Sequence, residues 1–177
     1  GKQILTDRPL FDELTATIIR QVGDLRKMVD EFSSFARLPK PIFRVENSVD
    51  LARQALFLQE VARPDIAFDF GARDNIDPIA CDRHQFGQAM TNVLKNAVEA
   101  IDAKAKTAAN ESYRGRILVE MTMAQPAGGS EKVVEIAITD NGIGLPQDRE
   151  RIVEPYVTTR EKGTGLGLAI VNKIIEE

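Results

Sequence analysis

Hydrophobic residues recur at intervals of four and three along the first forty residues of the chain. The residues that follow this spacing are Ile18, Val22, Leu25, Val29, Phe32 and Ala36. A repeat of this kind lines up apolar side chains along one stripe of an α-helix and is typical of a helix that packs in a bundle. Pro39 and Pro41 end the pattern, because proline interrupts a helix. The stripe could pack on the chain's own core or on a helix outside it.

Beyond the two prolines the pattern changes to a mixture of helical and strand periodicity, which predicts a separate α/β unit. The pattern predicts helices over 48–62, 83–103 and 166–177, and strands over 66–70, near 79, over 117–123 and over 133–139. Asp82 is placed to cap the long middle helix. The last two strands are close enough in sequence to form a hairpin.

The composition bounds the class of protein. The 177 residues are 43% hydrophobic and 28% charged, which is enough apolar material for a core and argues against disorder. The net charge of -4 argues against a nucleic-acid partner. We find no apolar run near the ~20 residues of a membrane helix, so we expect no direct membrane contact. A single cysteine and a single histidine, His84, argue against a disulfide framework or a histidine-rich metal centre.

Three polar positions lie on one face of the predicted middle helix. Asn92, Asn96 and Glu99 are spaced by four and three residues, so they project together. Apolar residues surround them, and an unpaired amide there would be costly. An asparagine oxygen is also a suitable ligand for Mg²⁺ that already carries phosphate oxygens. Bonds to nearby backbone or water remain the alternative for both amides.

A second candidate is the segment DNGIGL at the end of the last predicted strand. The carboxylate of Asp140 can accept a hydrogen bond from an exocyclic amino group, and Gly142 and Gly144 allow a flat ring such as adenine to approach. An ordinary Asp-Asn-Gly turn is the alternative.

The third candidate is KGTGLGL, which opens the last helix. Three glycines lie at or just before the start of this helix, namely Gly163, Gly165 and Gly167. The free N–H groups at a helix N-terminus bind phosphate favourably. The order of Lys162 and the glycines does not match a Walker A loop, and Leu168 stands where a dinucleotide fingerprint needs glycine. A flexible hinge before the helix is the alternative.

The three segments occur in the order of the N, G1 and G2 boxes of the ATP-binding fold of histidine kinases and their relatives, which the chain resembles. The segment EPYVTTREKG is similar to the F box of that family, with Tyr156 in the place usually taken by Phe. The resemblance implies an α+β fold, a two-layer α/β sandwich in which a mixed sheet carries helices on one face. A long bundle-forming helix precedes it.

The segment MVDEFSSFARLPKP is similar to the second helix of the dimerisation and phosphotransfer domain in NtrY-type nitrogen-regulation sensor kinases. The resemblance implies that residues 1–40 are that helix and residues 41–177 the catalytic ATP-binding domain, with its C-terminal strands missing. It also implies that the parent protein forms a homodimer through this helix. The parent is expected to be an inner-membrane sensor with this part in the cytoplasm.

The resemblance also assigns roles to residues. Asp140 would bind the adenine amino group, while Gly142 and Gly144 shape the pocket. Asn96 would hold Mg²⁺, and Asn92 would support the phosphates or the metal. The phosphate end of the ATP lid would consist of Gly163, Thr164, Gly165, Leu166 and Gly167. The weaker candidates are Lys95, Arg160 and Lys162 as phosphate-charge partners and Glu99 for polarising a water.

The implied activity is that of a protein-histidine kinase, which uses ATP and Mg²⁺ to phosphorylate a histidine. The phosphate would pass to an aspartate in the receiver domain of an NtrX-like response regulator. His84 lies in the predicted middle helix and does not match the phosphoacceptor position. We therefore expect this chain to bind Mg-ATP but not to autophosphorylate on histidine.

Two other classes remain open on the sequence. A related ATPase of the gyrase, chaperone or mismatch-repair type, or an anti-sigma serine kinase, would share the nucleotide motifs. A non-catalytic dimerising module would keep the helix but need no working nucleotide site. The intact Asn96, Asp140 and three lid glycines favour a working site.

Overall fold

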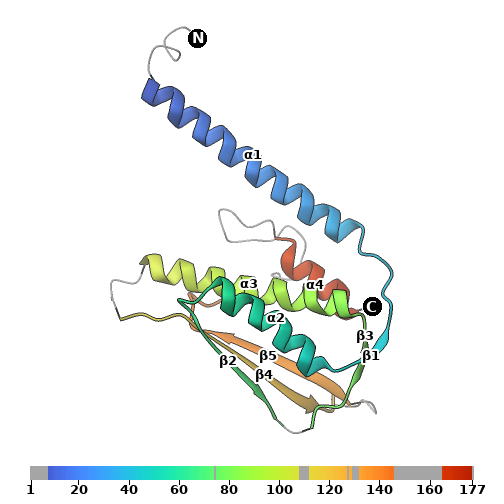
Figure 1. Ribbon diagram of the computed structural model, residues 1–177. Coiled ribbons are helices and arrows are strands. Elements are labelled where there is room, and N and C mark those ends of the chain that lie inside the picture. Colours follow the sequence, from blue (N-terminus) through green and yellow to red (C-terminus); the bar gives the residue numbers. More distant parts are fainter. Residues whose placement is uncertain are drawn as a thin grey trace.

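The computed structural model describes residues 8–73, 75–107, 112–126, 128, 132–145 and 165–176. A long helix, α1 (Arg8–Ala36), leads away from a layered α/β body (Figure 1). The body contains β1 (Arg44–Glu46), α2 (Ser48–Ala62), β2 (Ala67–Ala72), β3 (Ile79–Cys81), α3 (Arg83–Thr107), β4 (Arg116–Ala124), β5 (Val133–Asp140) and α4 (Gly167–Glu176). No described helix has the length and apolar character needed to cross a membrane.

The predicted helices and strands are present, and most of their bounds agree with the prediction to within two residues. Helix α3 ends at Thr107, one turn beyond its predicted end. Strand β1 was not predicted, because its one apolar residue, Val45, lies between two charged residues and gives no strand pattern. It pairs antiparallel with β3, and Arg44 lies opposite Cys81.

The main sheet has the strand order β2-β4-β5 and mixed pairing. Strand β2 runs parallel to β4, with Ala67 opposite Arg116, whereas β4 and β5 form the predicted antiparallel hairpin. Helices α2, α3 and α4 cover one face of this sheet (Figure 1). This arrangement confirms the predicted two-layer α+β fold.

The hydrophobic core lies between the sheet and the helices. Alternate residues of β4, namely Ile117, Val119 and Met121, are fully buried against the helical layer, as is Leu94 of α3. Helix α3 is the central helix, since it packs against α2 on one side and α4 on the other. Because α3 also contacts β5, its polar residues can lie next to both α4 and the end of β5.

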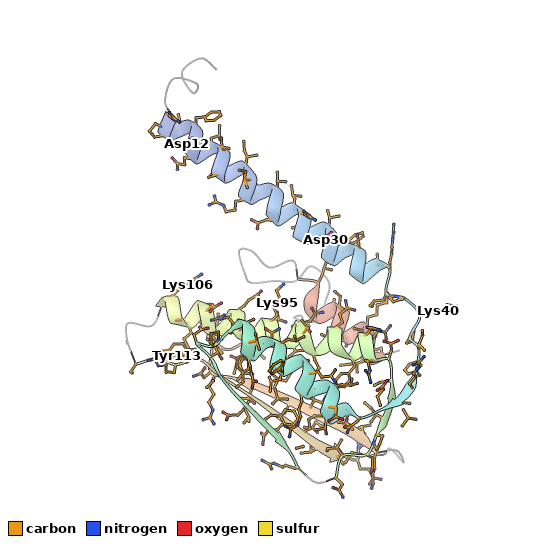
Figure 2. All side chains as sticks on the ribbon, in the orientation of Figure 1. Asp12, Asp30, Lys40, Lys95, Lys106 and Tyr113 are labelled. Atoms are coloured by element: carbon orange, nitrogen blue, oxygen red, sulfur yellow. The ribbon has the colours of Figure 1, made fainter. Side chains whose placement is uncertain are left out.

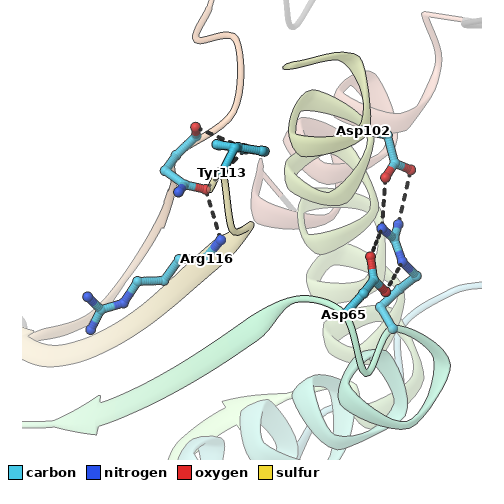
Figure 3. Close-up of polar contacts among 6 residues, drawn as sticks. Asp65, Asp102, Tyr113 and Arg116 are labelled. Carbon is cyan, nitrogen blue, oxygen red and sulfur yellow. Dashed lines mark hydrogen bonds and ion pairs between the residues drawn. The ribbon is translucent and has the colours of Figure 1, made fainter. Parts of the chain in front are cut away.

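An arginine joins the end of α2 to α3 on the outside of this core. The guanidinium of Arg63 donates two hydrogen bonds to Asp102, at 2.7 and 3.0 Å, and two more to Asp65 (Figure 3). The hydrogen bonds from Arg63 lower the pKa of Asp65 to about 2. Bidentate pairs of this geometry fix orientation as well as distance, so they set how α2 lies on α3.

The connection between α1 and the body is attached to the start of α3. The amide N–H of Ile42 donates to Oδ2 of Asp82 at 2.8 Å, and the buried Gln85 donates from Nε2 to the carbonyl of Pro39 at 3.0 Å. The apolar stripe of α1 is exposed. Ile18, Val22 and Leu25 each keep more than half of their surface accessible.

Candidate functional site

The turn after β5 presents the carboxylate of Asp140. Asp140 is the last residue of β5, as predicted, and its Oδ1 accepts a hydrogen bond from the N–H of Gly142 at 2.8 Å. Within the described part of the chain, Oδ2 accepts no hydrogen bond. One carboxylate oxygen therefore holds the turn, and the other remains available to a ligand.

The same turn lies directly on the backbone of α3. A Cβ atom at Gly142 would lie 2.5 Å from the carbonyl carbon of Ala100, so only glycine fits. The N–H of Ile143 donates to the carbonyl oxygen of Ala100 at 3.2 Å. Gly144 has a φ of 81°, a conformation that favours glycine. The two glycines thus place the turn against the helix that carries Asn92 and Asn96.

Asn141 holds the turn from its other side and was not singled out by the sequence patterns. Its Oδ1 accepts the N–H of Arg116 and its Nδ2 donates to the carbonyl of Arg114, both at 2.8 Å. Its own carbonyl accepts from Nζ of Lys104 at 2.7 Å. The same carbonyl accepts from the hydroxyl of Tyr113 at 3.2 Å (Figure 3). An asparagine between an aspartate and a glycine in a turn was the available signal.

The phenol of Tyr113 is a donor in this arrangement. Partial burial, followed by the negative charges of Asp140 and Asp102, raises the pKa of Tyr113 above its usual value. The hydroxyl therefore stays protonated at neutral pH and continues to donate. The influence of Asp140 also means that Tyr113 lies within electrostatic range of the candidate ligand-binding carboxylate.

Helix α3 carries the predicted asparagines on one side. Asn92, Asn96 and Glu99 are all partly buried, as expected for a helix face that borders α4. The Nδ2 atom of Asn92 is buried and has no hydrogen-bond partner among the described residues. Lys95 is exposed near the middle of the helix, on the face away from the sheet (Figure 2).

The N-terminus of α4 completes the described part of the site. Gly165 has a φ of 69°, Leu166 is fully buried, and Gly167 begins the helix. The first N–H groups of a helix have no partners within it and attract anions. The predicted lid residues Arg160, Lys162, Gly163 and Thr164, together with the predicted F box, lie outside the described residues.

The donor set suits an adenine nucleotide. A carboxylate oxygen at the strand end suits an amino group, and a helix N-terminus suits phosphate. The orphaned amide of Asn92 would gain a partner from a ligand oxygen, which offsets the cost of burying it unpaired. Among the described residues, no group of three or more His, Cys, Asp or Glu side chains is arranged so that it could hold a metal ion.

A separate groove lies between α2 and α3 and contains none of these residues. It encloses about 260 Å³ and is lined by Leu51, Gln54, Ala55, Leu58, Arg83, His84, Gly87 and Thr91. His84 is exposed in the first turn of α3, as the sequence indicated, where its N–H donates to Asp82. The groove therefore differs from the site formed by α3, the turn after β5 and α4.

A mixed sheet covered by three helices, with this turn and these asparagines, defines a known class of ATPase. Residues 81–177 match the family described as histidine kinase-, DNA gyrase B- and HSP90-like ATPases, and the chain belongs to that family. Over its whole length it is 49% identical to the nitrogen regulation protein NtrY of Azorhizobium caulinodans, of which it covers 22%. The predicted resemblance to NtrY-type sensor histidine kinases is thereby confirmed.

Two further relatives support this relationship. The chain is 33% identical to a putative NtrY-like sensor histidine kinase of Rickettsia conorii, over 98% of the chain and 27% of that protein. Full-length ShkA in complex with AMPPNP superposes with a TM-score of 0.65 at 27% identity, over 92% of this chain and 33% of that one. The chain spans about a quarter of the curated relatives it matches.

Proposed function

We propose that this chain is the ATP-binding, phosphoryl-donating part of an NtrY-type sensor histidine kinase, joined to one helix of its dimerisation domain. The observation that carries the proposal is the Asp140 turn, which keeps one carboxylate oxygen available and is packed on the helix that bears the orphaned Asn92 amide. The domain boundary falls at about residue 40, between α1 and the α/β body.

The adenine end of the nucleotide would bind at the turn after β5. Oδ2 of Asp140 accepts a hydrogen bond from the adenine amino group, while Oδ1 stays bonded to Gly142. Gly142 and Gly144 keep side chains out of the space beside the ring. ShkA, a relative of the same fold, has been crystallised in complex with AMPPNP, which supports an adenine nucleotide as the ligand.

The phosphate end would lie between α3 and α4. Gly165, Leu166 and Gly167 direct backbone N–H groups to the phosphates, and Asn92 supplies its buried amide. Asn96 holds Mg²⁺, which supplies charge neutralisation when bound. The proposed lid and charge partners are Gly163, Thr164, Arg160, Lys162 and Lys95, and Glu99 orients a water beside the metal site.

The reaction partner would be a histidine on the preceding helix of the parent's dimerisation domain. The exposed stripe of α1 would pack against that helix and against a second copy, which forms a homodimer. The phosphate would then pass to an aspartate of an NtrX-like response regulator. The parent would be an inner-membrane sensor with this part on the cytoplasmic side, and the isolated chain would not phosphorylate itself on histidine.

A nucleotide titration tests the proposal. Wild type should bind AMPPNP in the presence of Mg²⁺, and Asp140→Ala should weaken binding by about 10-fold or more, because a hydrogen bond to a charged group is worth ~1.5–3 kcal/mol. Asp77→Ala removes an exposed carboxylate of the β2–β3 connection and should leave the Kd unchanged. Absence of binding by wild type, or equal binding by Asp140→Ala, would contradict the proposal.

A further inference from the structure

Asn141 extends the β4–β5 pairing by one residue through its side chain. The last paired residues of the two strands are Ile117 and Asp140. Beyond them, the backbone N–H of Asn141 still donates to the carbonyl of Arg116 at 3.2 Å. The side-chain amide of Asn141 makes the next two bonds: it accepts from the N–H of Arg116 and donates to the carbonyl of Arg114, both at 2.8 Å. The side chain therefore replaces a backbone strand partner at the point where β5 turns away.

The backbone carbonyl of Asn141 is held from a second direction. Nζ of Lys104, on the last turns of α3, donates to it at 2.7 Å, and the hydroxyl of Tyr113 donates at 3.2 Å. The Lys104 ammonium also lies 5.3 Å from the centre of the Tyr113 ring, within the range of a cation–π interaction. Three segments far apart in the sequence, α3, the residues before β4 and the turn after β5, therefore meet at Asn141.

These contacts fix the peptide groups on both sides of Asn141. On one side is Asp140, whose carboxylate is proposed to accept a hydrogen bond from the adenine amino group. On the other is Gly142, which has no room to move toward α3 because the backbone of Ala100 is in contact. Without the side-chain amide of Asn141, the turn would keep its contact with α3 and its backbone bond to Arg116, but it would lose the two amide bonds to Arg114 and Arg116. The direction of the Asp140 carboxylate would then be less firmly fixed.

We propose that Asn141, clamped by Lys104 and Tyr113, is a positioning residue that aims the Asp140 carboxylate and so determines the preference for adenine over guanine. This inference rests on the proposed nucleotide-binding function. Adenine presents an amino group at the ring position where guanine presents a carbonyl oxygen. A carboxylate fixed at that position accepts from the first and repels the second, whereas a displaced carboxylate discriminates less.

The experiment measures Kd for AMPPNP and GMPPNP with wild type, Asn141→Ala, Asp140→Ala and the double variant. Asn141→Ala should weaken AMPPNP binding about 10-fold, the equivalent of ~1.4 kcal/mol, and leave the Kd for GMPPNP within about 2-fold. The double variant should bind AMPPNP no more weakly than Asp140→Ala, because Asn141 acts through Asp140. Thr139→Ala, an exposed neighbour on β5, is the matched control and should change neither Kd.

A structural role alone gives a different result. If Asn141→Ala weakens both nucleotides equally, or if its effect adds fully to that of Asp140→Ala, the inference is wrong. If Asn141→Ala does not fold, Tyr113→Phe replaces it, because this change removes only one hydroxyl and keeps the core contacts. Tyr113→Phe should likewise reduce the preference for AMPPNP over GMPPNP. Failure of wild type to bind AMPPNP would instead contradict the proposed function itself.

Discussion

At the scale of single residues, the position of Gly142 on α3 is the tightest constraint in the site. A methyl group there would meet the carbonyl carbon and oxygen of Ala100 at 2.5 and 2.7 Å, and these are backbone atoms that cannot move aside cheaply. The turn after β5 would have to shift away from the helix. Because Asp140 is bonded to the N–H of Gly142, such a shift would also move the candidate base-reading carboxylate.

Gly142→Ala should therefore lower both stability and nucleotide affinity. We expect a loss of about 1–3 kcal/mol in the free energy of unfolding, the usual cost of overpacking, measured by urea denaturation. Gly71→Ala is the matched control, since nothing lies within 4 Å of a Cβ at Gly71. It should change stability by less than ~1 kcal/mol and leave the Kd for AMPPNP unaltered. Equal effects of the two variants would contradict the packing argument.

The site residues that could be predicted from the sequence belong to local motifs, whereas those that could not depend on distant contacts. Asp140, Asn92 and Asn96 belong to short motifs whose spacing is visible in the chain, and the structure places them at the end of β5 and along α3. The role of Asn141 depends on Lys104, Tyr113 and the backbone of β4, which lie 25 to 37 residues away in the sequence. No local pattern predicts such a contact, because it exists only once the sheet and α3 are assembled.

At the scale of elements, the carboxylate of Asp82 at the start of α3 has two roles. Oδ1 of Asp82 accepts the N–H groups of His84 and Gln85 at 2.8 and 2.9 Å and thereby caps the helix. Oδ2 accepts the N–H of Ile42 in the connection from α1. The sequence predicted the cap from a local pattern, but the bond to Ile42 spans 40 residues and could not be predicted.

These bonds make stability depend on pH. The hydrogen bond from the N–H of Gln85, and next that from Ile42, lowers the pKa of Asp82 below its ordinary value. Because the pKa is lower in the folded state, the stabilisation is complete above about pH 4 and is lost as pH falls through the folded pKa. At pH 7, Asp82→Ala should cost ~0.5–2 kcal/mol, the usual value for a cap, and the difference from wild type should shrink below about pH 4.

Urea denaturation at pH 7 and at pH 3 measures this difference. Asp77→Ala removes an exposed carboxylate from the connection before β3 and should leave stability nearly unchanged at both values. A wild-type advantage over Asp82→Ala that is the same at pH 3 as at pH 7, or larger, would show that the carboxylate does not act through these hydrogen bonds.

At the scale of the whole molecule, we propose separate tasks for α1 and the α/β body. The body would contain the proposed nucleotide site, whereas α1 exposes a stripe in which Val22, Leu25 and Val29 are each at least 58% accessible. The 4-3 spacing predicted this helix and its stripe, but the sequence left open what the stripe packs against. The structure shows that the body does not bury it.

The stripe should therefore act in self-association and not in nucleotide binding. Replacing Val22 and Val29 with lysine should shift the chain toward monomer in sedimentation experiments at high protein concentration, because apolar burial between helices is lost. The Kd for AMPPNP should stay within about 2-fold. Arg20→Ala, on the opposite side of α1, is the control. A chain whose sedimentation does not respond to the stripe substitutions would contradict this role.

We infer that α3, the turn after β5 and the start of α4 form one nucleotide site. The most direct test is to follow backbone amide resonances by NMR while Mg²⁺ and AMPPNP are added to the chain. We predict that the largest shifts fall on Asn96, Gly142, Ile143 and Gly167, with little change at His84 in the α2–α3 groove. Shifts centred on that groove, or no saturable shifts at all, would show that the nucleotide does not bind at this site.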